Sequence, residues 1–268
     1  MIYTNYYPSS QLFHGAAPRL MGTRLDALLF GVERERMEMV WRQMIAEIGR
    51  LERMMSRFDT EAILFRLNRD AALFPADVPE ELWDVLQECK QYHERTDGYF
   101  DIAQGCFGGV EFDDARRTVF LPEGATLDLG ACGKGYALRA VRRLLEAEGV
   151  QRALVNFGDS SALATGAHPH GDGDGWPVGI CDPYTQKQRG VICLRNDALS
   201  VSGNAPSRPA HIIRPAAGAC VTGRKMTVAV ADDPVEAEAL TTALMAAGEE
   251  DVERIAVRFS VKEYGIYE

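Results

Sequence analysis

The chain has 268 residues, of which 46% are hydrophobic and 25% are charged, and this composition is typical of a globular protein with a full core. Its net charge of −10 argues against broad binding to nucleic acids or anionic membranes, so a bound phosphate would need local positive charge or a metal ion. Five histidines are too few for a histidine-rich metal cluster.

The six cysteines stand singly, and the absence of a C-x-x-C pair excludes a zinc ribbon and a thioredoxin motif. Scattered cysteines in apolar surroundings are typical of buried thiols in a reducing compartment. Residues 1–14 have neither the basic segment nor the apolar run of a signal peptide, and no apolar run is long enough to span a bilayer. We therefore expect a cytoplasmic location and no membrane span.

In chain order, the pattern first predicts a strand over residues 21–32 and then a long amphipathic helix over about residues 33–57. A second helix is expected after Pro79 and ends at the TDG of residues 96–98. Residues 118–129 predict two short strands, which lead into the next motif.

A third helix is expected from Lys134 to about Glu148, followed by a buried strand at residues 153–157 and by strands around Val178, Val191 and Leu199. The segment HPHGDGDGW at 168–176 lacks the spacing and closing glutamate of an EF-hand, so we interpret it as a hairpin turn rather than a calcium site.

The last predicted helix has a clear start signal, with Asp233 as N-cap, Pro234 in the first turn and Glu236 three residues after the cap. It ends at Gly248, and two terminal strands are expected to close the chain. No internal repeat is visible. The pattern therefore predicts one continuous α+β domain over residues 1–268, with residues 1–19 as a peripheral N-terminal extension.

The most informative stretch is LDLGACGKGYA at residues 127–137, where a short apolar strand is expected to end in a glycine-rich bend that opens a helix at Lys134. A helix N-terminus and a lysine favour an anion, so this stretch indicates a site for a phosphate-bearing ligand. It is neither a Walker A loop nor a dinucleotide fingerprint, and a helix start with a solvated lysine is the alternative.

Three further places carry candidate chemistry. Glu238 and Thr242 lie four residues apart on one helix face and could hold Mg²⁺, or Glu238 could be solvated and Thr242 bonded to its own helix. His211, after a polar loop, could act as a general base, contact a ligand or be structural. Asp101 could orient a ligand hydroxyl or amide, or it could cap a turn.

Taken in order, these segments resemble the FAD:protein FMN transferase, or ApbE-like, family over nearly the whole chain. The resemblance rests on MGT at 21–23, MSRFDTEAILFRLN at 55–68, TDGYFD at 96–101, LDLGACGKGYA at 127–137, LVNFG at 154–158, SG at 202–203 with HIIRPAAG at 211–218, and AEALTTA at 237–243.

The resemblance implies an α+β fold related to the T-fold, with mixed or antiparallel sheets flanked by helices. It also implies FAD as donor substrate, Mg²⁺ at the pyrophosphate and an acceptor flavoprotein that receives FMN on a threonine while AMP leaves. By position, it implies that Lys134 lies beside the phosphates and His211 by the reacting centre, that Met21, Phe58 and Asp101 line the flavin or adenosine pocket, and that the metal ligands are Glu238, Thr242 and the Gly133 carbonyl.

The chain departs from the family pattern at several of these segments. Ala62 and Ile63 replace a Ser-Glu pair, Glu238 replaces an aspartate, and the loop between Gly203 and His211 lacks an aromatic residue. The remaining departures are Gly133 for alanine, Asp159 for glycine, Arg214 for aspartate and Ala103 for threonine. A divergent member is therefore expected, with the fold kept and the activity altered or lost.

Three hypotheses follow from this comparison. The first is Mg²⁺-dependent FMN transfer from FAD to a protein threonine. The second is a non-catalytic protein of the same fold that binds FAD or another nucleotide. The third is a metal-dependent FAD pyrophosphatase without a protein acceptor.

Overall fold

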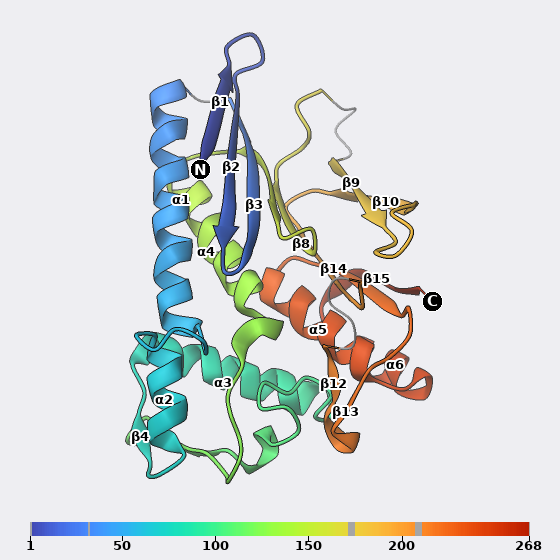
Figure 1. Cartoon of the computed structure of the whole chain (residues 1–268). Helices are drawn as coiled ribbons and strands as arrows, with labels where there is room; N and C mark the ends of the chain where they lie inside the picture. Colours follow the sequence, from blue (N-terminus) through green and yellow to red (C-terminus); the bar gives the residue numbers. More distant parts are fainter. Residues whose placement is uncertain (1, 32, 171–174, 207–210, 268) are drawn as a thin grey trace.

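The computed structural model describes residues 2–31, 33–170, 175–206 and 211–267, and its centre is an eight-stranded sheet (Figure 1). Every neighbouring pair in this sheet is antiparallel. The strand order is β1 (Tyr3–Tyr7), β2 (Leu12–Leu20), β3 (Thr23–Phe30), β7 (Arg152–Phe157), β8 (Ser161–Thr165), β11 (Ala198–Gly203), β14 (Met226–Ala231) and β15 (Val261–Tyr267).

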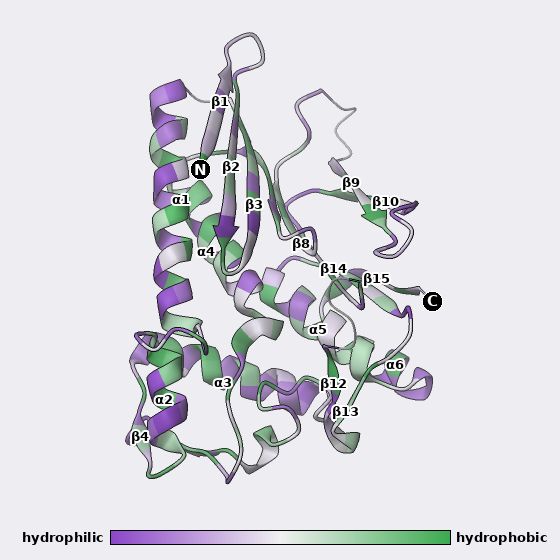
Figure 2. Cartoon of the chain, in the orientation of Figure 1, coloured by the Kyte–Doolittle hydropathy of each residue, from purple (hydrophilic) through white to green (hydrophobic). Residues whose placement is uncertain are grey.

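Three helices pack side by side against one face of the sheet, namely α1 (Arg34–Met55), α4 (Gly133–Ala147) and α5 (Pro234–Ala246) (Figure 1). Hydrophilic and hydrophobic residues alternate along α1, as Figure 2 shows, and its buried stripe faces β2 and α4. Trp41 of α1 lies directly over Gly15 of β2, where a Cβ atom would come within 2.7 Å of the indole ring. The sheet and helix can therefore approach closely only because residue 15 is glycine.

The opposite face is covered by a separate antiparallel pair, β9 (Trp176–Cys181) and β10 (Gln188–Leu194). Alternate residues of β14 divide between the two faces, because side chains along a strand point to opposite sides. Ala229 belongs to the core shared with the helices, whereas Val228 and Val230 pack in the second core around Trp176. All six residues of β14 are consequently buried.

The remaining elements extend from one end of the main layers (Figure 1). They comprise α2 (Ile63–Ala71), α3 (Glu80–Arg95), the short sheet of β4 (Ala76–Asp77), β6 (Thr118–Phe120) and β5 (Glu111–Asp113), the pair β12 (Ile213–Arg214) and β13 (Ala219–Cys220), and α6 (Glu249–Ala256). Among the described residues, no helix has the length and apolar character needed to cross a membrane.

The predicted α+β class is confirmed, and so are the long helix, the helix after Pro79, the helix from Lys134 and the capped helix at Asp233. The Asp233 carboxylate accepts hydrogen bonds from the backbone N–H groups of Val235 and Glu236, as an N-cap should. These predictions rested on long periodic patterns with local start and stop signals.

Several expectations need correction. Residues 12–19 are no peripheral extension, because Phe13 and Ala17 are buried in the core, while β1 forms the sheet edge. Residues 127–129 form no strand, because the Asp128 side chain caps a short 3₁₀ turn at Leu129–Ala131 instead. One strand at residues 118–120, rather than two over 118–129, therefore precedes the motif.

Towards the C-terminus, α6 and a single strand, β15, follow α5 in place of two strands. The segment 168–176 is no hairpin, because β8 and β9 belong to different sheets, and its residues 171–174 lie outside the described part. The expectation of buried thiols is correct for Cys89 and Cys132 and wrong for the exposed cysteines, which are Cys106, Cys181, Cys193 and Cys220.

Candidate functional site

A cavity of about 450 Å³ opens where the start of α4, the middle of α5 and the ends of β8 and β11 meet. Asp101, Lys134, His211, Glu238 and Thr242 all line it, although they come from four separate segments of the sequence. The fold thus brings together five of the residues that the resemblance implied. His211 is exposed, and residues 207–210 before it lie outside the described part of the chain.

The centre of this cavity wall is an ion pair between α4 and α5. The Lys134 ammonium lies 2.9 Å from Oε1 of Glu238, whose residue is only 3% exposed. The backbone N–H of Gly135 donates to Oε2 at 2.8 Å, and the Ser161 hydroxyl donates to Oε1 at 2.5 Å. These contacts offset the free-energy cost of burying a charged carboxylate. They also place the carboxylate at the N-terminus of α4, where the helix dipole favours negative charge.

Gly135 makes this arrangement possible because α4 and α5 cross at its position. A Cβ atom there would lie 2.8 Å from the carbonyl oxygen of Pro234 and from Cα of Val235. Only glycine lets the two helices approach closely enough for the Gly135 N–H to reach Glu238. The second glycine of the GKG motif therefore has a packing role.

A group of hydroxyls lies beside the ion pair on α5. Thr241 is fully buried, and its Oγ1 is 3.0 Å from the hydroxyls of Ser200 and Ser202 and donates to the Glu238 carbonyl. Thr242, its neighbour, instead lines the cavity. The prediction that Thr242 shares a face with Glu238 agrees with this placement, whereas no sequence pattern indicated the structural role of Thr241.

Asp101 lines the cavity, but its carboxylate is hydrogen-bonded to backbone N–H groups. It accepts hydrogen bonds from the N–H groups of Ala103 at 2.6 Å and Phe107 at 3.3 Å, and its side chain is only 2% exposed. This is the turn-forming alternative stated from the sequence. Asp101 thereby shapes the loop that carries another lining residue, Gln104.

Hydrogen bonds from a side chain of α2 hold the segment that precedes Lys134. The Asn68 side chain accepts from the Leu127 N–H at 2.8 Å and donates to the Leu127 carbonyl at 2.9 Å. Next along the chain, Asp128 caps the 3₁₀ turn and pairs with Arg57 at 3.1 Å. Two segments that the resemblance singled out separately, 55–68 and 127–137, are therefore joined in the fold.

Three expected site residues do not line the cavity. Phe58 is 79% exposed, with its ring 4.7 Å from the Arg57 guanidinium. Met21 adopts φ of 47° in the turn between β2 and β3 and packs against the main core. Gly133 is buried at the start of α4. Their roles toward a ligand stay predictions.

Of the substitutions that depart from the family pattern, Asp159 and Glu238 line the cavity and the other substituted residues lie elsewhere in the described structure. Asp159 is exposed on the cavity rim and accepts a hydrogen bond from Asn156. Arg214 is exposed in β12, and Ala103 is buried and donates its backbone N–H to the Asp101 carboxylate. Ala62 is buried at the N-terminus of α2, where no side chain caps the helix. The replaced Ser-Glu pair therefore leaves a helix start without a capping hydroxyl.

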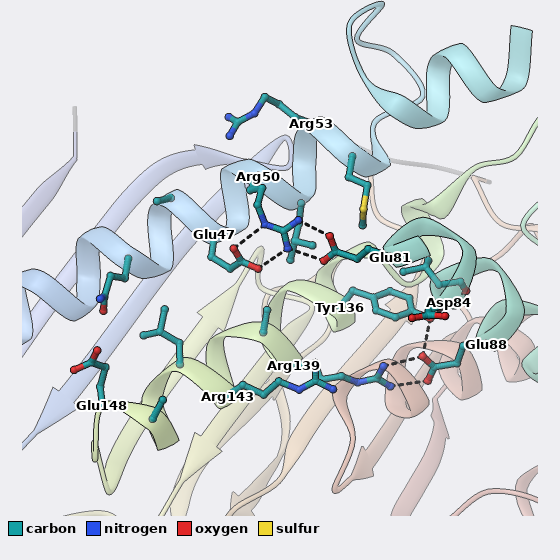
Figure 3. Close-up of a pocket in the computed structure, with 18 residues that line it drawn as sticks. Glu47, Arg50, Arg53, Glu81, Asp84, Glu88, Tyr136, Arg139, Arg143 and Glu148 are labelled. Carbon is teal, nitrogen blue, oxygen red and sulfur yellow. Dashed lines mark hydrogen bonds and ion pairs between the residues drawn. The ribbon is translucent and has the colours of Figure 1, made fainter. Parts of the chain in front are cut away.

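A second cavity, of about 790 Å³, lies between α1, α3 and α4 (Figure 3). Its main charges neutralise one another, because Arg50 pairs with Glu47 and Glu81 while Arg139 binds Glu88 through two hydrogen bonds. Burial alone would raise the pKa of Glu88, but the hydrogen bonds and charge of Arg139 outweigh it and lower that pKa. These ion pairs hold α1, α3 and α4 together, so the charged groups of the larger cavity are occupied by one another. The smaller cavity is therefore the better candidate site.

The smaller cavity carries oxygen donors of the kind that Mg²⁺ takes, on Glu238 and Thr242. Among the described residues, no three His, Cys, Asp or Glu side chains gather as a metal-binding group. Mg²⁺, however, usually takes one or two carboxylates from the protein and its other ligands from water and phosphate. Glu238 and Thr242 fit that pattern, because both line the cavity and, among the described residues, Oε2 of Glu238 accepts one hydrogen bond, from the Gly135 N–H.

A model of the ApbE family matches residues 21–108 and 106–264. The chain belongs to the ApbE family. Curated relatives named FAD:protein FMN transferase, from Klebsiella pneumoniae (strain 342) and Escherichia coli (strain K12), are 24% and 23% identical to it. Each alignment covers 92% of this chain, with 81% of the Klebsiella and 82% of the Escherichia protein.

Solved ApbE structures share the fold. The ApbE protein of Thermotoga maritima matches with a TM-score of 0.82 and 19% identity, over 96% of both chains. The flavin transferase ApbE of Vibrio cholerae matches with a TM-score of 0.78 and 20% identity, over 96% of this chain and 97% of its own. The ApbE-like, α+β architecture predicted from the sequence is thus confirmed.

Proposed function

We propose that this ApbE-family protein transfers FMN from FAD to a threonine of an acceptor flavoprotein, in a Mg²⁺-dependent reaction that releases AMP. The observation that carries the proposal is the cavity wall on which Lys134, Glu238, Thr242 and His211 meet. The names of the curated relatives support the same donor and product.

In this reaction, the threonine oxygen attacks the phosphorus of the FMN half, the phosphoanhydride bond to AMP breaks, and the threonine proton passes to a base. Lys134, at the N-terminus of α4, offsets negative charge on the pyrophosphate. His211, exposed at the cavity rim, takes the proton. A Mg²⁺ ion held by Glu238 and Thr242 would neutralise phosphate charge when bound.

The test is to incubate the purified protein with FAD and Mg²⁺, with and without an acceptor domain, and to measure AMP and flavin fluorescence of the denatured acceptor. AMP with covalent flavin is expected, and an acceptor without its threonine should stay unlabelled. Chelation of Mg²⁺ should abolish both products. AMP release without labelling would instead support the pyrophosphatase, and FAD binding without either product the non-catalytic protein.

Lys134→Ala and His211→Ala separate the two proposed roles. Lys134→Ala should weaken FAD binding and slow the reaction, because the pyrophosphate loses its fixed cation. His211→Ala should slow the reaction by roughly 10²–10⁴-fold while FAD binding changes little, as expected for a proton-transfer group. Full activity of His211→Ala would exclude it as the base.

A further inference from the structure

Among the described residues, Ser161 is the one side chain outside α4 that hydrogen-bonds the Glu238 carboxylate. Ser161 is the first residue of β8, and both Ser161 and Glu238 are only 3% exposed. No prediction from the sequence assigned it a role. Its partner lies 77 residues away in the chain, so no local pattern could reveal the contact.

We propose that Ser161 is a positioning residue that fixes the Glu238 carboxylate and, through it, Lys134 on the cavity wall; this inference rests on the proposed function. Oε1 accepts from both Ser161 and Lys134, so one oxygen links the strand to the lysine. Among the residues that the structure describes, Oε2 accepts from the Gly135 N–H. The orientation of the Glu238 carboxylate is therefore fixed by donors at both of its oxygen atoms.

The length of the glutamate explains why this support matters. A glutamate has one more methylene than an aspartate, and its terminal torsion is broad and intrinsically soft. Without the Ser161 hydroxyl, the carboxylate can rotate about that torsion, and Lys134 loses the fixed counter-charge that orients it. Ser161 thus adapts the site to a glutamate at position 238, where the related motif has an aspartate.

Ser161 also leaves the second oxygen available. A carboxylate offers about four lone-pair positions, of which the donors just described use three. The remaining position is on Oε2, and the orientation fixed by Ser161 keeps it constant. A cation or an ordered water bound there would therefore meet a preset ligand rather than a mobile one.

The experiment measures the FAD dissociation constant by quenching of flavin fluorescence in buffer with Mg²⁺, which requires no turnover. Ser161→Ala should raise this constant by about 10-fold, the lower end of the effect of removing a group that orients a ligand. Ser161→Thr keeps the hydroxyl and should restore binding close to that of the unmodified protein.

A matched control tests for a general loss of stability. Thr227 is fully buried, donates to the Thr241 carbonyl at 2.8 Å and does not line the cavity. Thr227→Val should lower the urea midpoint as Ser161→Ala does, without changing FAD affinity. An equal loss of FAD affinity in both variants would overturn the proposal.

The decisive comparison repeats Ser161→Ala in a Glu238→Asp background. Because the shorter side chain does not reach Ser161, the second substitution should have no further effect on FAD affinity. The same 10-fold loss in both backgrounds, or no loss in either, would overturn the positioning role. A protein that binds FAD but makes no AMP would refute the proposed function alone, since the Ser161 readout is binding.

Discussion

Replacing Asn68 with alanine tests how the cavity wall is built. In the structure, the Asn68 amide from α2 bridges both backbone groups of Leu127, which stands just before the turn that leads to Lys134. Alanine at position 68 removes both hydrogen bonds at once. It leaves a buried N–H and C=O of residue 127 to find other partners, so both stability and site geometry should suffer.

The size of the effect follows from these two bonds. Each intramolecular hydrogen bond contributes ~0.5–1.5 kcal/mol net, so Asn68→Ala should destabilise the protein by ~1–3 kcal/mol. With a urea dependence of ~3 kcal/mol per molar, the midpoint of unfolding should fall by ~0.3–1 M. FAD affinity should fall as well, because the turn before Lys134 loses its anchor.

The assay is urea unfolding followed by circular dichroism, with FAD titration on the same preparations. The control is Gln87→Ala, which removes an exposed amide with a single hydrogen bond to Asp114 and should change the free energy of unfolding by less than ~0.5 kcal/mol. If Asn68→Ala unfolds at the same urea concentration as Gln87→Ala and binds FAD normally, the bridging argument is refuted.

Three further predictions concern the packing around the site. Gly15→Ala should destabilise the protein by ~1–3 kcal/mol or more in urea unfolding, because the new methyl group would lie 2.7 Å from Trp41. Gly135→Ala should separate α4 from α5 and weaken FAD binding, which fluorescence titration would detect. A hydrogen bond with Cys89 and burial raise the pKa of the Cys132 thiol, so its stabilising contribution is complete below about pH 9 and is lost as the pH rises further. Urea unfolding below and above about pH 9 should show the fall in the free energy of unfolding, and Cys132→Ala should make that fall smaller.

Local sequence signals predicted those elements whose cause is local. The helix at Asp233 followed from its N-cap and proline, and α1 followed from an apolar stripe at helical spacing. The prediction failed where the signal was short. The eight residues of α6 carry only a charged first turn and a few apolar residues, and the LDL of residues 127–129 has the composition of a strand without its hydrogen-bonding partner.

The candidate site was predictable only in part, for the same reason. Lys134 and Glu238 are conspicuous within motifs, whereas Asn68 and Ser161 act on backbone or side chains 59 and 77 residues away. A polar residue gives no sequence signal for a partner at that separation. Phe58 is the opposite case. It stands at a conspicuous motif position in the sequence, but its side chain is largely exposed and does not line the cavity.

The ion pair across α4 and α5 also sets when the site can form during synthesis. The Gly135–Glu238 contact joins residues 103 positions apart, and contacts of such separation form late because the intervening chain must first be closed. A nascent chain carries Lys134 long before residue 238 leaves the ribosome. Lys134 therefore lacks its counter-charge until α5 has been made, and FAD binding should appear only once the chain has folded to its C-terminal helices.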